Sequence, residues 1–305
     1  MKQRKKILIV GGTGFLGYYL CKEALKRNWI VTSISTKKPR KLRYLKKVEY
    51  LICDISKKNK VNNLNRNFNY IVNFGGYVDH KNKKRTYESH YLGCKNLADH
   101  FVNKKIESFI QLGSSVEYGS VKSPQKETSN TTVKKLKSMY GKSKLLATNY
   151  LLELHKQKNF PVTILRLYLV YGPNQDVNRF IPIIIKGCLK DLDFDSSKGT
   201  QRRDFIYISD VIDIIVKCLK SKKTKGHIFN VGTGSSVKIK EVIEYIKKMI
   251  QKGRPNYGKI KFRKDEILNL YPSINKAKKI IKWIPKKNFE LGLKKTIQYY
   301  KSLTD

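Results

Sequence analysis

The stretch that decides the fold is residues 7–17, which read Ile-Leu-Ile-Val-Gly-Gly-Thr-Gly-Phe-Leu-Gly. Its first four residues form a short apolar run typical of a buried strand, and a helical pattern extends from residue 15 to residue 27. Glycines at three-residue intervals allow a tight turn and a close approach of phosphate oxygens, and the helix N-terminus adds backbone donors and positive potential. The stretch therefore predicts a dinucleotide-binding turn at Gly11, Gly14, Phe15, Leu16 and Gly17.

Similar apolar runs recur along the chain, and helical patterns separate them. The order strand, helix, strand predicts an α/β fold with a doubly wound parallel sheet, whose ligand lies beyond the carboxyl ends of the strands. The remaining expected strands are residues 29–34, 50–53, 70–73, 109–112, 163–167 and 228–231.

Length and cysteine spacing limit the class of protein. A chain of 305 residues can bury one large core with a smaller lobe. We expect a dinucleotide-binding domain over 1–173, to which 205–235 return, and a substrate lobe from 174–204 and 236–305. The five cysteines have no Cys-x-x-Cys spacing, which favours reduced thiols and a cytoplasmic protein without a metal site or a disulfide framework. No apolar run is long enough to predict membrane insertion.

The formal net charge of +42 raises nucleic-acid binding as an alternative function. The basic residues are mostly Lys and occur along the whole chain, which is typical of a solvated surface. Zinc-finger spacing, RNA-recognition signatures and arginine-rich arms are all missing from the sequence. We therefore expect no specific nucleic-acid partner, although polyanions should bind nonspecifically at low salt.

Tyr140 and Lys144 form the candidate catalytic pair. They lie four residues apart in a predicted helix, so both side chains should project from one face. A phenol beside an ammonium is a poised proton donor, as the reduction of a sugar carbonyl requires. In a lysine-rich chain this spacing also arises by chance, so the assignment depends on other motifs.

Those motifs follow in a fixed order along nearly the whole chain. They are the glycine turn, Asp54, residues 73–76, residues 113–119, Tyr140 with Lys144, Arg166, residues 171–173, residues 201–207, residues 230–232 and residues 282–285. Together they resemble the extended short-chain dehydrogenase/reductases that act on nucleotide sugars. The form Ser-Ser-Val-Glu-Tyr-Gly at 114–119 and the segment 270–278 look most like C4 reductases of the abequose synthase type.

The resemblance implies a Rossmann-type doubly wound sheet with a smaller C-terminal substrate-binding lobe, and a role for each matched residue. Catalysis would fall to Ser114, Tyr140 and Lys144. The cofactor would contact the glycine turn, Ser35, Thr36, Lys37, Asp54, Ile55, Gly75, Gly76, Tyr140 and Lys144. A nucleotide-diphosphate sugar would contact Ser115, Arg179, Arg203 and Arg263. For several of these residues a purely structural role remains the alternative to ligand binding: Asp54 would cap a turn, and an Arg would be only a surface charge. Family members commonly form homodimers through the helices that here would follow Thr86 and Tyr140.

Departures from the family pattern narrow the reaction. The 4,6-dehydratases of this family carry an Asp-Glu pair directly after the catalytic hydroxyl residue, whereas this chain has Ser115 and Val116 there. Glu117 is displaced by one position and should face the other way, which argues against dehydration. The family's Asn on the helix before Gly93 is replaced by His90, which we expect to be a buried, hydrogen-bonded residue.

Cofactor choice depends on the end of the second strand. NAD enzymes place an acid there to accept hydrogen bonds from the ribose 2'-hydroxyl, but residues 35–38 read Ser-Thr-Lys-Lys. Hydroxyls and cations receive a 2'-phosphate that an acid would repel, so NADP(H) is favoured and NAD(H) remains possible. Together with the resemblance to C4 reductases, this implies an NADPH-dependent reductase of a nucleotide-linked 4-keto-6-deoxy-hexose. The alternatives are an NAD-dependent C4 or C2 epimerase and, from another class, a non-catalytic Rossmann binding protein.

Overall fold

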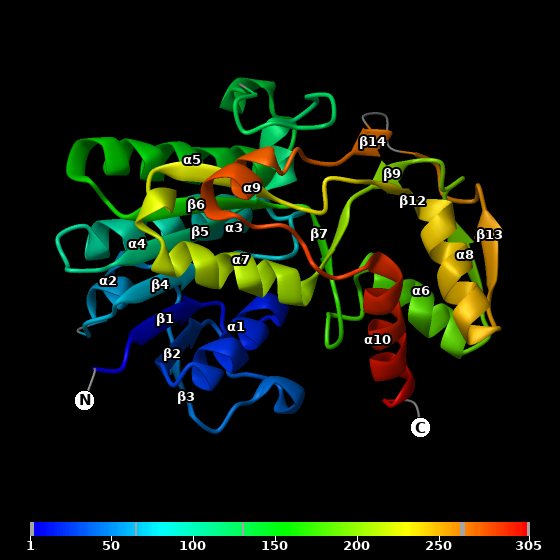
Figure 1. The fold of residues 1–305 in the computed structure, drawn as a ribbon, viewed down its shortest axis with the longest axis horizontal. Helices are drawn as coiled ribbons and strands as arrows, with labels where there is room; N and C mark the ends of the chain where they lie inside the picture. The colour runs from blue at the N-terminus through cyan, green and yellow to red at the C-terminus, as the bar shows by residue number, and fades with distance from the viewer. Residues whose placement is uncertain (1–2, 65, 130, 263–265, 304–305) are drawn as a thin grey trace.

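A parallel sheet of seven strands forms the centre of the protein (Figure 1). The computed structural model describes residues 3–64, 66–129, 131–262 and 266–303. The strand order is β11-β6-β5-β4-β1-β2-β3, so the chain changes direction across the sheet between β1 and β4. This confirms the predicted doubly wound sheet. The strands are β1 (Lys6–Val10), β2 (Ile30–Ser35), β3 (Val48–Ile52), β4 (Tyr70–Asn73), β5 (Ser108–Ser114), β6 (Val162–Leu167) and β11 (His227–Val231).

Helices cover both faces of this sheet. Helices α1 and α7 pack against each other on one face, and on the other face α4 contacts both α2 and α5. A short helix α3 and a π-helical turn η2 precede α4 and contact α5. The bounds are α1 (Phe15–Lys26), α2 (Lys58–Asn62), α3 (Lys83–Tyr87), η2 (Glu88–Leu92), α4 (Gly93–Phe101), α5 (Met139–Lys158) and α7 (Ile208–Lys220).

The apolar strands are explained by burial on both faces. In β1, Ile7 and Ile9 belong to the core cluster on the side of α1 and α7. Leu8 and Val10 belong to a second cluster, with residues of α4 and α5. Successive side chains point to opposite faces, so a strand covered on both sides is apolar throughout.

The length of helix α5 is set by a polar residue at each end. The Ser138 side chain accepts a hydrogen bond from the Gly141 amide at 3.1 Å and caps the N-terminus. The helix stops at Asn159, whose φ of 52° lies in the left-handed region. These ends place Tyr140 and Lys144 in the first two turns of the helix.

The rest of the chain forms a smaller group of elements, most of it on the right of Figure 1. Three short sheets pair β7 with β10, β9 with β12 and β14, and β8 with β13. Within the described ranges, no helix is both long enough and apolar enough to cross a membrane. The strands are β7 (Leu169–Tyr171), β8 (Asp193–Ser196), β9 (Arg202–Arg203), β10 (Phe205–Tyr207), β12 (Val237–Lys238), β13 (Arg254–Tyr257) and β14 (Asn269–Leu270), and the helices are α6 (Phe180–Leu189), α8 (Ile239–Ile250), α9 (Asn275–Ile281) and α10 (Phe289–Lys301).

Candidate active site

The glycine turn joins β1 to α1 with the geometry of an anion-binding loop. Gly11 has a φ of +78°, and its carbonyl accepts a hydrogen bond from the Gly14 amide at 3.0 Å. A Cβ atom on Gly17 would lie 2.2 Å from the Gly11 carbonyl oxygen, so only glycine lets α1 approach the turn. Helix α1 has no side-chain cap and no acidic residue in its first turn, so its positive end is free for phosphate.

Phe15 and Leu16 follow the turn, and only their backbones would be available to a bound cofactor. The side chain of Phe15 is buried in the core, and Leu16 packs against the same cluster. At the end of β2, Ser35 has a buried hydroxyl without a hydrogen-bond partner, while Thr36 and Lys37 are exposed. The Gly11 amide donates to the Ile34 carbonyl at 2.7 Å, so the end of β2 lies beside the glycine turn.

Asp54 and Ile55 follow β3, and the structure gives them different surroundings. The Asp54 carboxylate accepts hydrogen bonds from the amide and the hydroxyl of Ser56, at 3.0 and 2.8 Å, so it caps a turn. Ile55 is buried, and its side chain lies under Gly75 and Gly93. Among the residues that the structure describes, the second Asp54 oxygen accepts no hydrogen bond, so it stays available for a ligand.

The end of β4 is joined to the end of β5 through side-chain amides. Asn73 accepts a hydrogen bond from the Gly75 amide at 2.9 Å and donates one to Gln111 at 2.8 Å. Gln111 in turn donates to the Leu112 carbonyl at 3.1 Å. The glycines expected to line the cofactor's path are thus held against the strand that carries Ser114.

Lys144 lies against the carboxyl end of β5, which Ser114 terminates, and Tyr140 lies beside Lys144 on α5. Ser114 is the last residue of that strand, and the buried Lys144 ammonium donates to the Leu112 carbonyl at 2.7 Å. Its nitrogen lies 6.0 Å from the centre of the Tyr140 ring. Ser114 and Lys144, which are 30 positions apart in the chain, are therefore brought to the same end of β5.

Two histidines that the sequence did not single out as site residues surround the Tyr140 ring. His80 stacks on it, with ring centres 3.9 Å apart and planes 11° apart, and His90 meets it edge-on at 4.9 Å. His90 donates through Nε2 to the Tyr77 carbonyl at 3.1 Å, which leaves Nδ1 buried without a partner. Burial, and then the charge of Lys144, lower the pKa of His90 to about 2. Both rings belong to the segment after β4, and only the packing of η2 on α5 shows that they reach Tyr140.

The expected substrate residues have different surroundings. Ser115 is buried directly after Ser114. Arg179 is exposed at the N-terminus of α6, near enough to His80 to help lower the pKa of that imidazole, which burial lowers most. Arg203 is half-buried and donates to the Glu266 carboxylate and to the Ile267 carbonyl. Arg263 lies outside the described residues.

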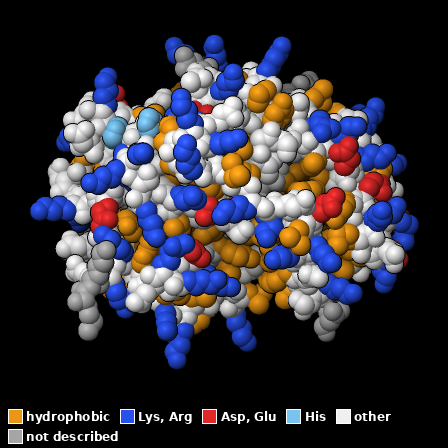
Figure 2. All heavy atoms as spheres, in the orientation of Figure 1, with side chains coloured by type: hydrophobic (Ala, Val, Ile, Leu, Met, Phe, Trp, Pro, Cys, Tyr) orange, Lys and Arg blue, Asp and Glu red, His pale blue; other side chains and the backbone are white. Residues whose placement is uncertain are grey.

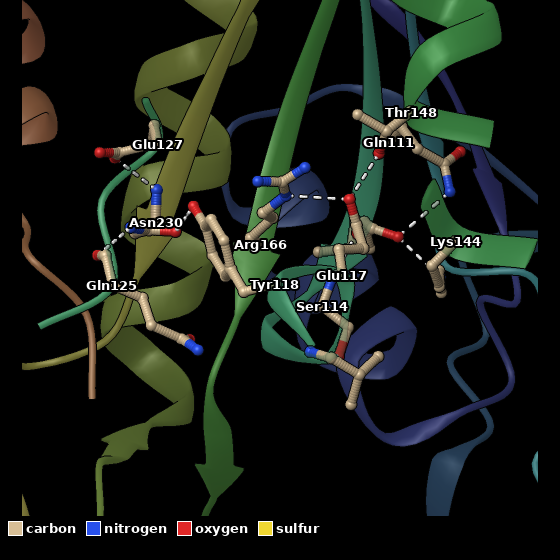
Figure 3. Close-up of polar contacts among 12 residues, drawn as sticks. Gln111, Ser114, Glu117, Tyr118, Gln125, Glu127, Lys144, Thr148, Arg166 and Asn230 are labelled. Atoms are coloured by element: carbon tan, nitrogen blue, oxygen red, sulfur yellow. Dashed lines mark hydrogen bonds and ion pairs between the residues drawn. The ribbon is translucent and has the colours of Figure 1, made fainter. Parts of the chain in front are cut away.

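Glu117 does not face the expected reaction site. Its carboxylate is fully buried and accepts hydrogen bonds from the Ser114 amide, Thr148 and Arg166 (Figure 3). Ser115 and Val116 stand between it and Ser114 in sequence, and neither carries a carboxyl group. The sequence predicted that Glu117 turns away from the site, but it contained no signal that Thr148 binds this carboxylate.

Comparisons with known proteins identify the family of the chain. The model of the "NAD dependent epimerase/dehydratase family" matches residues 7–232, which is most of the chain. The chain belongs to this family. The matched range extends from β1 to β11 and includes Ser114, Tyr140 and Lys144.

Individual relatives of the family differ in their reactions. CDP-abequose synthase of Salmonella muenchen is 37% identical over 135 residues, a match that spans 44% of this chain and 46% of that protein. UDP-N-acetyl-alpha-D-glucosaminuronate decarboxylase of Bacillus cytotoxicus is 26% identical over 98% of this chain and 99% of its own length.

Two solved structures of nucleotide-sugar epimerases share the fold of the chain. UDP-glucose 4-epimerase of Thermotoga maritima, solved with UDP-glucose, superimposes with a TM-score of 0.92 over 98% of this chain and 100% of that one, at 21% identity. UDP-glucuronic acid 4-epimerase of Bacillus cereus, in complex with UDP-glucuronic acid and NAD, gives a TM-score of 0.88 over 98% of this chain and 99% of that one, at 25% identity.

Proposed function

We propose that this protein is an NADPH-dependent reductase of a nucleotide-linked 4-keto-6-deoxy-hexose. The observation that carries the proposal is the end of β2, where residues 35–38 read Ser-Thr-Lys-Lys without an acid and Thr36, Lys37 and Lys38 are exposed. A cofactor with a 2'-phosphate suits this end better than one with a free 2'-hydroxyl. A replaceable NADPH in turn suits net reduction better than an internal oxidation and re-reduction cycle.

The site residues have complementary tasks in such a reduction. The Ser114 hydroxyl would donate a hydrogen bond to the C4 carbonyl oxygen, and the Tyr140 phenol would give that oxygen its proton. Lys144 keeps further N–H donors beside its bond to Leu112, and these would hold ribose hydroxyls. Bound NADPH supplies the hydride that reaches C4, so the ketone becomes an alcohol with one hydride and one proton added.

The surroundings of Ser114 argue against dehydration. Removing water from the sugar needs a carboxyl group beside the reacting carbon, and the nearest one in sequence is Glu117. Its oxygens are occupied by Ser114, Thr148 and Arg166 in the interior. The partial match to CDP-abequose synthase also favours a nucleotide-sugar substrate processed at C4.

The test is the consumption of NADPH by the purified protein with a nucleotide-linked 4-keto-6-deoxy sugar. With NADPH deuterated at nicotinamide C4, we expect one deuterium at C4 of the sugar product by NMR. An epimerase, which the match to the UDP-glucuronic acid epimerase supports as the alternative, would isomerise sugar without consuming added cofactor. That outcome would overturn the reductase proposal.

A variant at the end of β2 tests the choice between NADPH and NADH. Ser35→Asp places a carboxylate where we expect the 2'-phosphate, so NADPH binding should weaken at least tenfold while NADH binding is kept or improved. Dissociation constants from the quenching of intrinsic fluorescence measure both. An unchanged preference would show that Ser35 does not lie at the 2' position.

We also propose that the protein forms a homodimer through α4 and α5. These helices contact each other on one face of the sheet. Leu146 and Tyr150 of α5, and Tyr91 of η2 directly before α4, are half-buried. Leu146→Arg should shift the mass measured by light scattering from dimer to monomer, and Met249→Arg on α8, which replaces an exposed apolar residue elsewhere, should not.

A further inference from the structure

Glu117 joins three elements around the candidate site. Its carboxylate is fully buried, and its Oε1 accepts a hydrogen bond from the Ser114 amide at 2.8 Å. Its Oε2 accepts one from the Thr148 hydroxyl at 2.8 Å and one from Arg166 Nε at 2.9 Å. The end of β5, helix α5 and strand β6 therefore meet at one side chain (Figure 3).

Helix α5 is tied to β5 at two points. Lys144 donates to the Leu112 carbonyl at 2.7 Å, and Thr148, one turn later on the same face, donates to Glu117. Leu112 and Glu117 lie on either side of Ser114 in the sequence. The helix cannot slide along the strand without breaking a buried hydrogen bond to a charged group, which is among the stronger interactions in a protein interior.

The position of the carboxylate is itself fixed by its neighbours. A Cβ atom on Gly113 would lie 2.5 Å from Glu117 Oε1, so the backbone leaves just enough room for it. The Arg166 guanidinium also lies 4.4 Å from the centre of the Tyr118 ring, and the Tyr118 hydroxyl donates to Asn230 on β11 at 2.7 Å. The carboxylate is therefore anchored in the interior and cannot turn towards a substrate.

We propose that Glu117 and Thr148 are positioning residues that set the register of α5 against the end of β5. Through this register they fix the separation between the Ser114 hydroxyl and the Tyr140 phenol. The proposal depends on the proposed function only for the roles of Ser114 and Tyr140, and it holds for any reaction in which both act on one sugar oxygen.

The variant that tests it is Thr148→Val, which removes the hydroxyl at nearly constant volume. We expect kcat to fall about ten- to a hundredfold, because small displacements of reacting groups have effects of this size. The KM for the sugar and the dissociation constant of NADPH should change less than about twofold, since no ligand-contacting group is altered. Thr148→Ser restores the hydroxyl and should restore kcat.

Thr163→Val is the matched control. Thr163 is another fully buried threonine of the same domain, and its hydroxyl bonds to Thr224 at the other end of the sheet, where β6 begins. A loss of stability alone would affect both variants, whereas only Thr148→Val should lower kcat. If Thr148→Val does not fold, Thr148→Ala replaces it in the test, because the smaller alanine also lacks the hydroxyl.

Two outcomes would overturn the positioning proposal. One is a Thr148 variant with the kcat of the wild type, and the other is a crystal structure of that variant in which the Ser114 Oγ to Tyr140 Oη separation is unchanged. The second measurement needs no turnover. If the wild-type protein epimerises sugar or turns over no nucleotide sugar, the proposed function fails, and the structural comparison still decides the role of Thr148.

Discussion

Tyr140 is the residue on which the enzymatic interpretation depends. Tyr140→Phe removes the hydroxyl and keeps the ring that packs against His80 and His90. We expect turnover to fall by a factor of about 10² to 10⁴, the usual effect of losing a proton-transfer group, with NADPH affinity nearly unchanged. Steady-state kinetics and a fluorescence titration measure the two effects. Tyr91→Phe, on the neighbouring helix turn, serves as the control.

His90 should make the protein sensitive to acid. Its pKa is lowered to about 2 in the folded state and is about 6.5 when unfolded, so below pH 6.5 only the unfolded chain takes up the proton. The stability this group provides is complete above pH 6.5 and falls by about 1.4 kcal/mol for each pH unit below it. His90→Asn removes the titrating group, and urea unfolding at pH 7.5 and 5.5 compares the two proteins.

The wild type should lose about 1.4 kcal/mol more than His90→Asn between these pH values. An equal loss in both proteins would show that the imidazole is protonated in the folded state. It would also mean that the buried Nδ1 has access to water, in conflict with its burial beside Tyr140.

At the scale of elements, α5 carries Tyr140 and Lys144 of the candidate site. We expect protein stability to depend on the backbone conformation that residue 159 adopts at the C-terminal end of this helix. Asn159 ends it at a φ of 52°, a conformation that costs most residues about 1 kcal/mol and glycine much less. Asn159→Ala should therefore lower the free energy of unfolding by about 1 kcal/mol, and Asn159→Gly should leave it nearly unchanged. A similar loss in both variants would point to the amide side chain instead.

The same elements show why glycine positions were predictable and side-chain partners were not. The turn between β1 and α1 is local, so the spacing of Gly11, Gly14 and Gly17 was enough to predict its shape. His80 and Tyr140 are 60 positions apart, and their stacking depends on how the segment from His80 through α3 and η2 packs on α5. No periodicity in the sequence encodes such a contact.

At the scale of the whole molecule, the positive charge is spread over the surface. Lys and Arg side chains, blue in Figure 2, cover the visible face with only a few acidic residues between them. With a formal charge of +42, association with anionic nucleotides should be accelerated by long-range attraction. Raising the salt concentration from 0.05 to 0.5 M should lower the association rate of NADPH several-fold.

Stopped-flow fluorescence measures this rate, and NADH is the control because it lacks the additional phosphate. The salt dependence should be steeper for NADPH than for NADH, and dissociation rates should change little for either. An association rate independent of salt would contradict steering by the surface charge.

The sequence by itself determined the α/β class, the parallel sheet, the glycine turn and the candidate residues Ser114, Tyr140 and Lys144, because each depends on local spacing and on burial of apolar strands. Only the tertiary structure decided that Glu117 lies in the interior between Thr148 and Arg166 and that His80 covers Tyr140. These contacts join segments far apart in the chain. They exist only once the sheet has fixed which strand ends meet which helices.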